Sequence, residues 1–201
     1  MKKQTKSLIL SIGILLSVLF ATIAHAQVSL GVKAGINGAT EPYTGYEHEQ
    51  LALPYAGLYL QYRANWFGLQ LGANYSPEGT NLENLNTGDT FHDRQTYLNV
   101  PLLLQGHFDF GGYIECGAEY GFLLSSTSST DGGASVDTKQ DYTSTNFSVA
   151  GGIGYDFNHK AKRGLGINIR YIRGLTSITQ SQYYGDAVKM RVLSAALTYT
   201  F

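Results

Sequence analysis

The feature that most constrains this chain is an alternation of apolar and polar residues with a period of two, which recurs eight times. In residues 28–37, apolar residues such as Val28 and Leu30 alternate with polar or small residues such as Ser29. Successive side chains of a β-strand point to opposite faces, so this pattern predicts a strand with one apolar and one polar face. The same pattern predicts seven further strands, over residues 55–63, 67–76, 96–106, 112–124, 145–157, 164–173 and 190–201.

The lengths of these segments and of their connections predict a membrane-spanning barrel. Each segment has about ten residues, near the length that a tilted strand needs to cross a bilayer. The connections after the second, fourth and sixth segments are short turns, around Asn65, Asp109 and His159. The other four are long, over residues 38–54, 77–95, 125–144 and 174–189. This alternation is typical of an eight-stranded antiparallel up-and-down transmembrane β-barrel, with short turns and both termini on the periplasmic side.

The composition of the two faces predicts which side of the sheet meets lipid. A soluble β-barrel or sandwich, the alternative, would turn its apolar face inward and carry many charges outside. Here the polar faces hold mainly glycine and small residues, which suits a narrow interior. We therefore expect the apolar faces to meet the membrane. Aromatic residues near the strand ends predict two interfacial girdles, from Tyr62, Phe67, Tyr75, Phe157, Tyr171, Tyr199 and Phe201.

The first 26 residues have the three-part layout of a secretory signal peptide. Three lysines within the first six residues precede an apolar run over about 8–23, which ends in Ala24-His25-Ala26, a small-x-small cleavage pattern. A transmembrane anchor is disfavoured because the run is short and no stop-transfer flank follows. We expect residues 1–26 to be a cleaved signal peptide and residues 27–201 to form the barrel domain.

Composition argues against several other classes of protein. Without residues 1–26 the chain would carry 11 basic and 15 acidic residues, which gives no reason to expect a nucleic-acid partner. No apolar run of transmembrane-helix length follows residue 26. Cys116 is the sole cysteine, so no internal disulfide can form, and we interpret it as a small apolar side chain.

Six charged residues fall on the polar faces, and their charges cancel. An eight-stranded barrel is just wide enough for its own side chains, and an unpaired charge there costs several kcal/mol. We therefore interpret the six as a structural ion-pair network that plugs the lumen, rather than as the lining of a narrow pore. The residues are Lys33, Arg63, Glu115, Glu119, Asp156 and Arg170.

The long connections are acidic, and residues 125–130 form a low-complexity run of serine and threonine. The simplest interpretation is solvated, mobile loops. Binding of divalent cations or of a basic partner is the alternative, although no EF-hand-like spacing supports a specific calcium site. The acidic residues are Glu41, Glu47, Glu49, Glu78, Glu83, Asp89, Asp93, Asp131, Asp137, Asp141 and Asp186.

Arg173 and Arg191 break the face rule, because both have lipid-facing parity. Each lies about nine or ten residues from the periplasmic end of its strand, so the two are expected at similar height near the outer rim. We hypothesise that they contact phosphates of lipopolysaccharide, since the guanidinium fork matches phosphate oxygens. Snorkelling to the headgroup level is the alternative.

A lipid-modifying enzyme would need Ser, His and an acidic group together near the membrane face. His48 and His92 fall in the predicted loops, and His107 and His159 in the predicted short turns. No metal-ligand spacing occurs, and no phosphate-binding loop precedes a helix. The sequence therefore predicts no catalytic residue, no metal site and no cofactor.

Four segments together resemble the PorT-like outer-membrane β-barrel family, which comprises small eight-stranded barrels of the OmpA and OmpX type. They are residues 31–37 (GVKAGIN), 75–79 (YSPEG), 97–104 (YLNVPLLL) and 170–176 (RYIRGLT). Tyr199 and the terminal Phe201 are similar to the aromatic signal that the barrel-assembly machinery reads. The resemblance implies a barrel in the outer membrane of a Gram-negative envelope, in contact with its lipid and lipopolysaccharide, but no single activity.

These observations support three hypotheses about function. The first is a non-enzymatic barrel with an envelope-structural or surface-interaction role through its acidic loops. The second is a component of a secretion or assembly complex that uses the periplasmic rim with Lys160, Lys162 and Arg163, because one founding member of the resembled family is tied to protein secretion. The third is a lipid-modifying enzyme. Separately, Pro101 cannot donate a ladder hydrogen bond, which predicts a local bulge.

Overall fold

The structure is a computed structural model that describes residues 27–40, 46–84, 90–130, 135–161, 163–177 and 189–201. The predicted signal peptide, residues 1–26, lies outside the described residues. The elements are β1 (Gln27–Thr40), β2 (Tyr46–Ala64), β3 (Phe67–Asn84), β4 (Thr90–His107), β5 (Gly112–Thr130), β6 (Val136–Asp137), the 3-10 helix η2 (Lys139–Asp141), β7 (Thr145–Asp156), β8 (Gly164–Gly174) and β9 (Arg191–Thr200).

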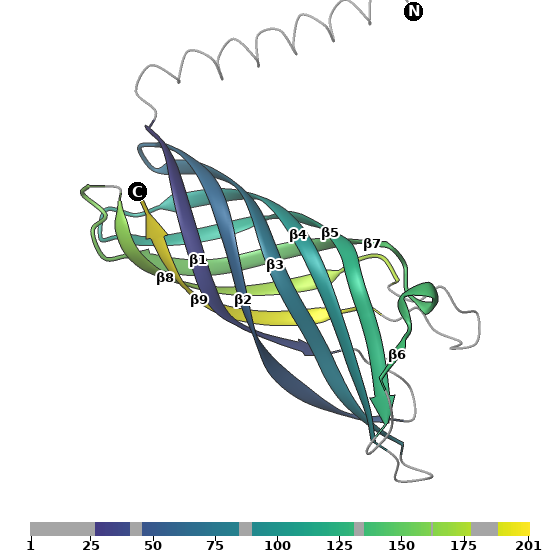
Figure 1. Ribbon diagram of the computed structural model, residues 1–201. Coiled ribbons are helices and arrows are strands. Elements are labelled where there is room, and N and C mark those ends of the chain that lie inside the picture. Colours follow the sequence, from purple (N-terminus) through teal and green to yellow (C-terminus); the bar gives the residue numbers. More distant parts are fainter. Residues whose placement is uncertain (1–26, 41–45, 85–89, 131–134, 162, 178–188) are drawn as a thin grey trace, which may run out of the picture.

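Eight long strands close into one antiparallel barrel (Figure 1). Each long strand pairs with the next one along the chain, and β9 pairs with β1 to close the ring. Following paired residues once round the barrel from Gly112 leads back to β5 at Phe122, ten residues farther along. This offset means that the strands are strongly tilted to the barrel axis. The predicted eight-stranded fold is confirmed; β6 is a two-residue strand beside β5, outside the ring.

The short turns and the chain ends lie together at one end of the barrel. The start of β1 and the C terminus are both at this short-turn end (Figure 1). Asn65 adopts a positive φ of 50° in the tight turn between β2 and β3, and Gly111 and Gly164 adopt positive φ beside the other two turns. Asn and Gly tolerate this conformation better than other residues, which explains why the short turns form at these points.

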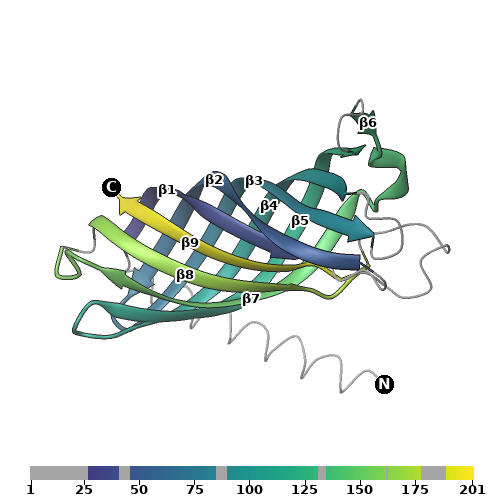
Figure 2. The same cartoon turned by 90° about the horizontal axis from the view of Figure 1, so that it is seen from below.

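Strands β2 to β5 are longer than the alternation predicted. The sequence placed loops over 38–54, 77–95 and 125–144, but backbone pairing continues through much of these ranges. For example, Thr80 on β3 pairs with Asp93 on β4. At the long-loop end, β2 before Leu51 has no partner in β1, and β5 beyond Phe122 has no partner in β7. The four strands therefore continue past their neighbours as a projecting sheet, carrying β6 at its edge (Figures 1 and 2).

The two faces of the barrel have the predicted orientation. On β9, residues from Arg191 to Thr200 alternate strictly between exposed and buried, and the exposed apolar side chains include Leu193, Leu197 and Tyr199. The buried side chains on the same strand include Ser194 and Thr198. Most of the large exposed side chains elsewhere in the barrel are likewise apolar or aromatic, so an apolar surface surrounds a mainly polar interior.

The bulge predicted at Pro101 is wrong. The β3–β4 register is the same before and after Pro101, although pairing is interrupted between Leu71 and Asn74. Pro101 is fully buried and lies over Gly72, where an added Cβ would approach its ring to 3.0 Å. Because Gly72 has no side chain, the proline ring fits over it, and the two strands keep their register. The β4–β5 irregularity occurs instead between Thr96 and Tyr97.

Candidate functional site

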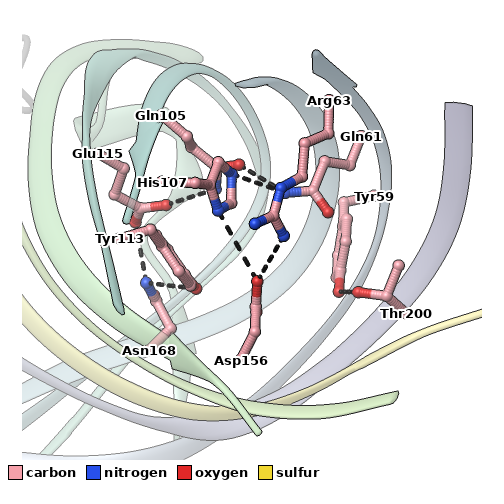
Figure 3. A network of polar contacts seen from close by, with 10 residues as sticks. All are labelled: Tyr59, Gln61, Arg63, Gln105, His107, Tyr113, Glu115, Asp156, Asn168 and Thr200. Carbon is pink, nitrogen blue, oxygen red and sulfur yellow. Dashed lines mark hydrogen bonds and ion pairs between the residues drawn. The ribbon is translucent and has the colours of Figure 1, made fainter. Parts of the chain in front are cut away.

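At the short-turn end, the lumen holds a polar network whose residues come from β2, β4, β5, β7, β8 and β9 (Figure 3). The Arg63 Nη1 atom on β2 donates to Asp156 Oδ2 on β7 at 3.0 Å. His107, the last residue of β4, places Nδ1 3.8 Å from the same carboxylate oxygen. His107 is buried, so the sequence-based assignment of this residue to a periplasmic turn is wrong. These contacts tie β2, β4 and β7 together across the interior.

A second ion pair lies deeper in the lumen. Arg170 Nε donates to Glu115 Oε1 at 2.7 Å, and both side chains are almost completely buried. Gln105 Nε2 donates to the other carboxylate oxygen at 3.1 Å, while Asn168 Nδ2 donates to Oε1 at 3.1 Å. Gln61 Nε2 in turn donates to Gln105 Oε1 at 2.7 Å (Figure 3). The Glu115 carboxylate is therefore satisfied by side chains from two other strands, as a buried charge requires.

The remaining two charges of the predicted network, Lys33 on β1 and Glu119 on β5, are buried without a direct bond to each other. Lys33 lies within electrostatic reach of Glu119, Glu115 and Arg170. Among the described residues, neither Lys33 Nζ nor Glu119 Oε2 has a hydrogen-bond partner. The structure thus brings four of the six predicted residues into two direct ion pairs and leaves Lys33 and Glu119 as a looser, long-range pair.

Nearer the long-loop end, Glu78 joins a hydrogen-bonded group that the sequence did not reveal. Ser76 Oγ donates to Glu78 Oε1 at 2.8 Å and accepts from Asn37 Nδ2 at 2.7 Å. Asn99 Nδ2 lies 3.3 Å from the same Glu78 oxygen. Glu78 was predicted to be a solvated loop residue. It is buried because β3 continues through it and directs its side chain inward.

Apolar side chains also face the interior, contrary to a lumen filled only by small and polar groups. A buried cluster includes Leu103 on β4, Leu123 on β5, Ile172 on β8 and Val192 on β9, together with Met190 before β9. These residues have the parity of the polar faces, yet they pack against one another inside the barrel. Close-packed aliphatic groups leave little room for water, so this cluster and the ion-pair network together fill the lumen.

The segment after β5 folds back onto the projecting sheet. Tyr142, which follows η2, is buried, and its hydroxyl lies 3.4 Å from Asp93 Oδ2 on β4. Ser126 and Thr138 form a hydroxyl pair at 3.0 Å, and the Lys139 ammonium donates to the Leu124 carbonyl at 2.8 Å. Asp93, expected to be a solvated loop residue, is therefore buried, and that expectation is wrong for it. Val136 and Asp137, by contrast, remain exposed.

Within the described part of the chain, no group of three His, Cys, Asp or Glu side chains is arranged to hold a metal ion. His92 lies on β4 rather than in a loop, and His159 lies in the turn after β7. The side chain of His48 falls outside the described residues.

On the outer surface of the barrel, Arg173 on β8 and Arg191 on β9 are direct pairing partners, and both are exposed. They therefore lie at adjacent positions near the long-loop end, at the similar height that was expected from their distances to the periplasmic ends of their strands. Tyr199 and Phe201 lie at the opposite end, where their exposed rings meet edge to face at 5.1 Å between centroids.

The family model for the outer membrane protein β-barrel domain matches residues 25–180 of this chain. The chain belongs to this family. It is accordingly an outer-membrane β-barrel protein of a Gram-negative envelope, and its apolar outer surface is the surface that meets lipid. The narrower PorT-like resemblance is not part of this result. No curated protein matches the chain.

The chain is similar to solved structures at low sequence identity. The Ail attachment invasion locus protein of Yersinia pestis, solved with a heparin analogue, sucrose octasulfate, aligns with a TM-score of 0.51 and 14% identity over 87% of this chain and 99% of Ail. Neisserial surface protein A aligns with a TM-score of 0.48 and 15% identity over 88% of this chain and 99% of that protein.

The described residues of this outer-membrane protein contain no helix with the length and apolar composition of a membrane span.

Proposed function

We propose that this outer-membrane protein is a non-enzymatic, non-conducting scaffold that holds the projecting sheet at the cell surface for contact with envelope or external macromolecules. The continuation of β2–β5 past the ends of β1 and β7 carries this proposal. A strand needs only about ten residues to cross the membrane, whereas β2, β3, β4 and β5 have 18 or 19 residues each. The additional length indicates that the projecting sheet lies outside the bilayer.

The filled lumen supports the second half of the proposal, that the barrel does not conduct ions. Ion pairs at 2.7 Å and 3.0 Å join strands across the interior. An apolar cluster occupies the part of the lumen nearer the long-loop end. An eight-stranded barrel has no room for an aqueous channel beside such side chains. Purified protein in planar bilayers is expected to give no stepwise conductance in molar potassium chloride. Regular, reproducible conductance steps would contradict this part of the proposal.

A crosslinking experiment in living cells tests the surface role. A photoreactive amino acid at Val136, which is exposed on β6 at the outer tip, is compared with one at Lys160, which is exposed in the periplasmic turn after β7. We expect adducts with another envelope or extracellular macromolecule from position 136 and none from position 160. Heat-dependent migration on a gel verifies that both variants fold.

The same experiment tests the secretion or assembly alternative, which the PorT-like resemblance favours. Lys160 and Arg163 are exposed at the periplasmic rim, and Lys162 lies outside the described residues. Adducts from position 160 alone would support that alternative and contradict the surface role. Adducts from neither position would contradict any interaction role and leave an envelope-structural one.

We further propose that Tyr199 and Phe201 serve as the signal for the barrel-assembly machinery. The support is their pair of exposed aromatic rings, in edge-to-face contact on the lipid-facing side of β9 at the short-turn end of the barrel. Phe201→Ser is expected to reduce the heat-shifted, membrane-integrated fraction several-fold in cells, while the same variant refolds normally into detergent. Phe157→Ser removes an exposed aromatic ring elsewhere and is the matched control. Equal assembly of the Phe201 variant and the parent would contradict the proposal.

A further inference from the structure

Arg173 and Arg191 form an unusual pair on the lipid-facing surface. Their Cα atoms are direct partners across the β8–β9 ladder, and both side chains are exposed. Lys189, two residues before Arg191 and also exposed, adds a third positive charge nearby. Like charges placed directly opposite each other on neighbouring strands destabilise a sheet. An anion bound between the two arginines would offset this repulsion.

The described protein surface around the pair does not supply that anion. Below the arginines, toward the membrane centre, the outward-facing neighbours are Tyr171 on β8 and Leu193 on β9. Across the β7–β8 ladder, the partner of Arg173 is Val149. Within the described residues, Arg173 and Arg191 make no salt bridge to an acidic side chain. Among the described residues no acidic side chain supplies the counter-charge, so a bound anion is a candidate for it.

The position of the pair identifies the source of the anion. Tyr171 precedes Arg173 on the outer face of β8, and the Leu175 amide after Arg173 bonds to the Phe147 carbonyl at 2.8 Å. Exposed aromatic rings mark the boundary between acyl chains and headgroups. The arginines therefore lie where the phosphates of the outer leaflet lie. Partial exclusion of water at this level strengthens an ionic contact relative to one in bulk solvent.

We infer that Arg173 and Arg191 together bind a phosphate group of lipid A, the anchor of lipopolysaccharide. Two guanidinium forks on adjacent strands can each present paired N–H donors to phosphate oxygens. Binding removes the mutual repulsion of the pair, so each arginine makes the other's contribution more favourable. The site is on the barrel wall and is independent of the projecting sheet and its proposed surface role.

Titration of the delipidated, folded barrel with lipid A in a neutral detergent tests this site. Native mass spectrometry measures bound bisphosphorylated lipid A for the parent and for Arg173→Gln/Arg191→Gln. Because the variant loses both charge-assisted contacts to the phosphate, it should bind at least about tenfold more weakly. The control is Lys160→Gln/Arg163→Gln, which removes two exposed cations at the periplasmic end and should bind like the parent.

Two further conditions separate the lipid from other anions and from a folding defect. Inorganic phosphate at millimolar concentration should not displace lipid A, because the site requires the acyl chains to hold the phosphate at the barrel wall. Heat-dependent gel migration shows whether the double variant folds, and Arg173→Gln alone replaces it if it does not. Parent-like affinity of the folded variant, an equal loss in the periplasmic control, or displacement by inorganic phosphate would each overturn the inference.

Discussion

Replacing Arg170 with methionine is expected to lower the free energy of unfolding of the barrel by about 3–5 kcal/mol, the usual cost of breaking a buried ion pair. Arg170 donates to Glu115 at 2.7 Å, and the exposed fraction of its side chain is only 4%. Without Arg170, the Glu115 carboxylate keeps Gln105 and Asn168 as partners but loses the cation bonded directly to it. Urea unfolding of the protein in lipid vesicles, followed by heat-dependent gel migration, measures the change.

The double variant Glu115→Met/Arg170→Met isolates the pair itself. Because it removes both charges of this pair, neither partner is left as an unpaired ion, and it should recover most of the stability lost in the single variant. Arg163→Met removes an exposed arginine from the turn before β8 and should change the free energy of unfolding by about 0.5 kcal/mol or less. A single Arg170 variant as stable as the Arg163 control would show that the lumen does not depend on this ion pair.

Placing an arginine at Ile169, in the middle of the lipid-facing side of β8, is expected to destabilise the folded barrel by about 2–4 kcal/mol, the cost measured for Arg or Lys at the bilayer midplane. Ile169 is exposed and pairs with Ile153 on β7 and Ala195 on β9, both of which also face outward. An arginine there would have to pull its charge through acyl chains to reach a headgroup. The same urea unfolding in vesicles measures the loss.

Leu175→Arg is the matched control for the Ile169 variant. Leu175 is also exposed, but it lies beyond Arg173, at the end of β8. A cation near the interface costs about 0–1 kcal/mol, so this variant should remain close to the parent. Equal effects at the two positions would contradict a membrane boundary between them. A stabilising effect of Ile169→Arg would contradict the lipid-facing assignment of this row altogether.

The sequence was sufficient for the barrel wherever one face of a strand meets lipid. On β9 the alternation of apolar and polar residues coincides with the alternation of exposed and buried side chains along the whole strand. The signal fails above the membrane, where both faces of a strand meet water or polar groups. Residues 125–130 are serine and threonine throughout, yet they pair with β4 as part of β5, because ladder hydrogen bonds do not require an apolar face.

The contents of the lumen were less predictable than its boundary. The alternation of strand faces placed the six network charges inside the barrel, but it could not show which of them would form ion pairs. Arg170 and Glu115 touch because their strands are staggered by the barrel's tilt, which no local pattern reveals. Leu103 and Leu123 lie on the same faces of their strands as polar residues. Only the closed structure shows that both belong to one apolar cluster inside the barrel. The burial of His107 and Glu78 likewise follows from strand ends that the pattern misplaced.

The central claim, that the apolar rows face lipid, can be tested at the only native cysteine. Cys116 is exposed on β5, where it pairs with Leu104 on β4 and Gly151 on β7. A fluorophore attached to Cys116 in the folded barrel in vesicles should be strongly quenched by lipids with brominated acyl chains and protected from iodide in the water. Strong quenching by iodide, with none by brominated lipid, would contradict the account.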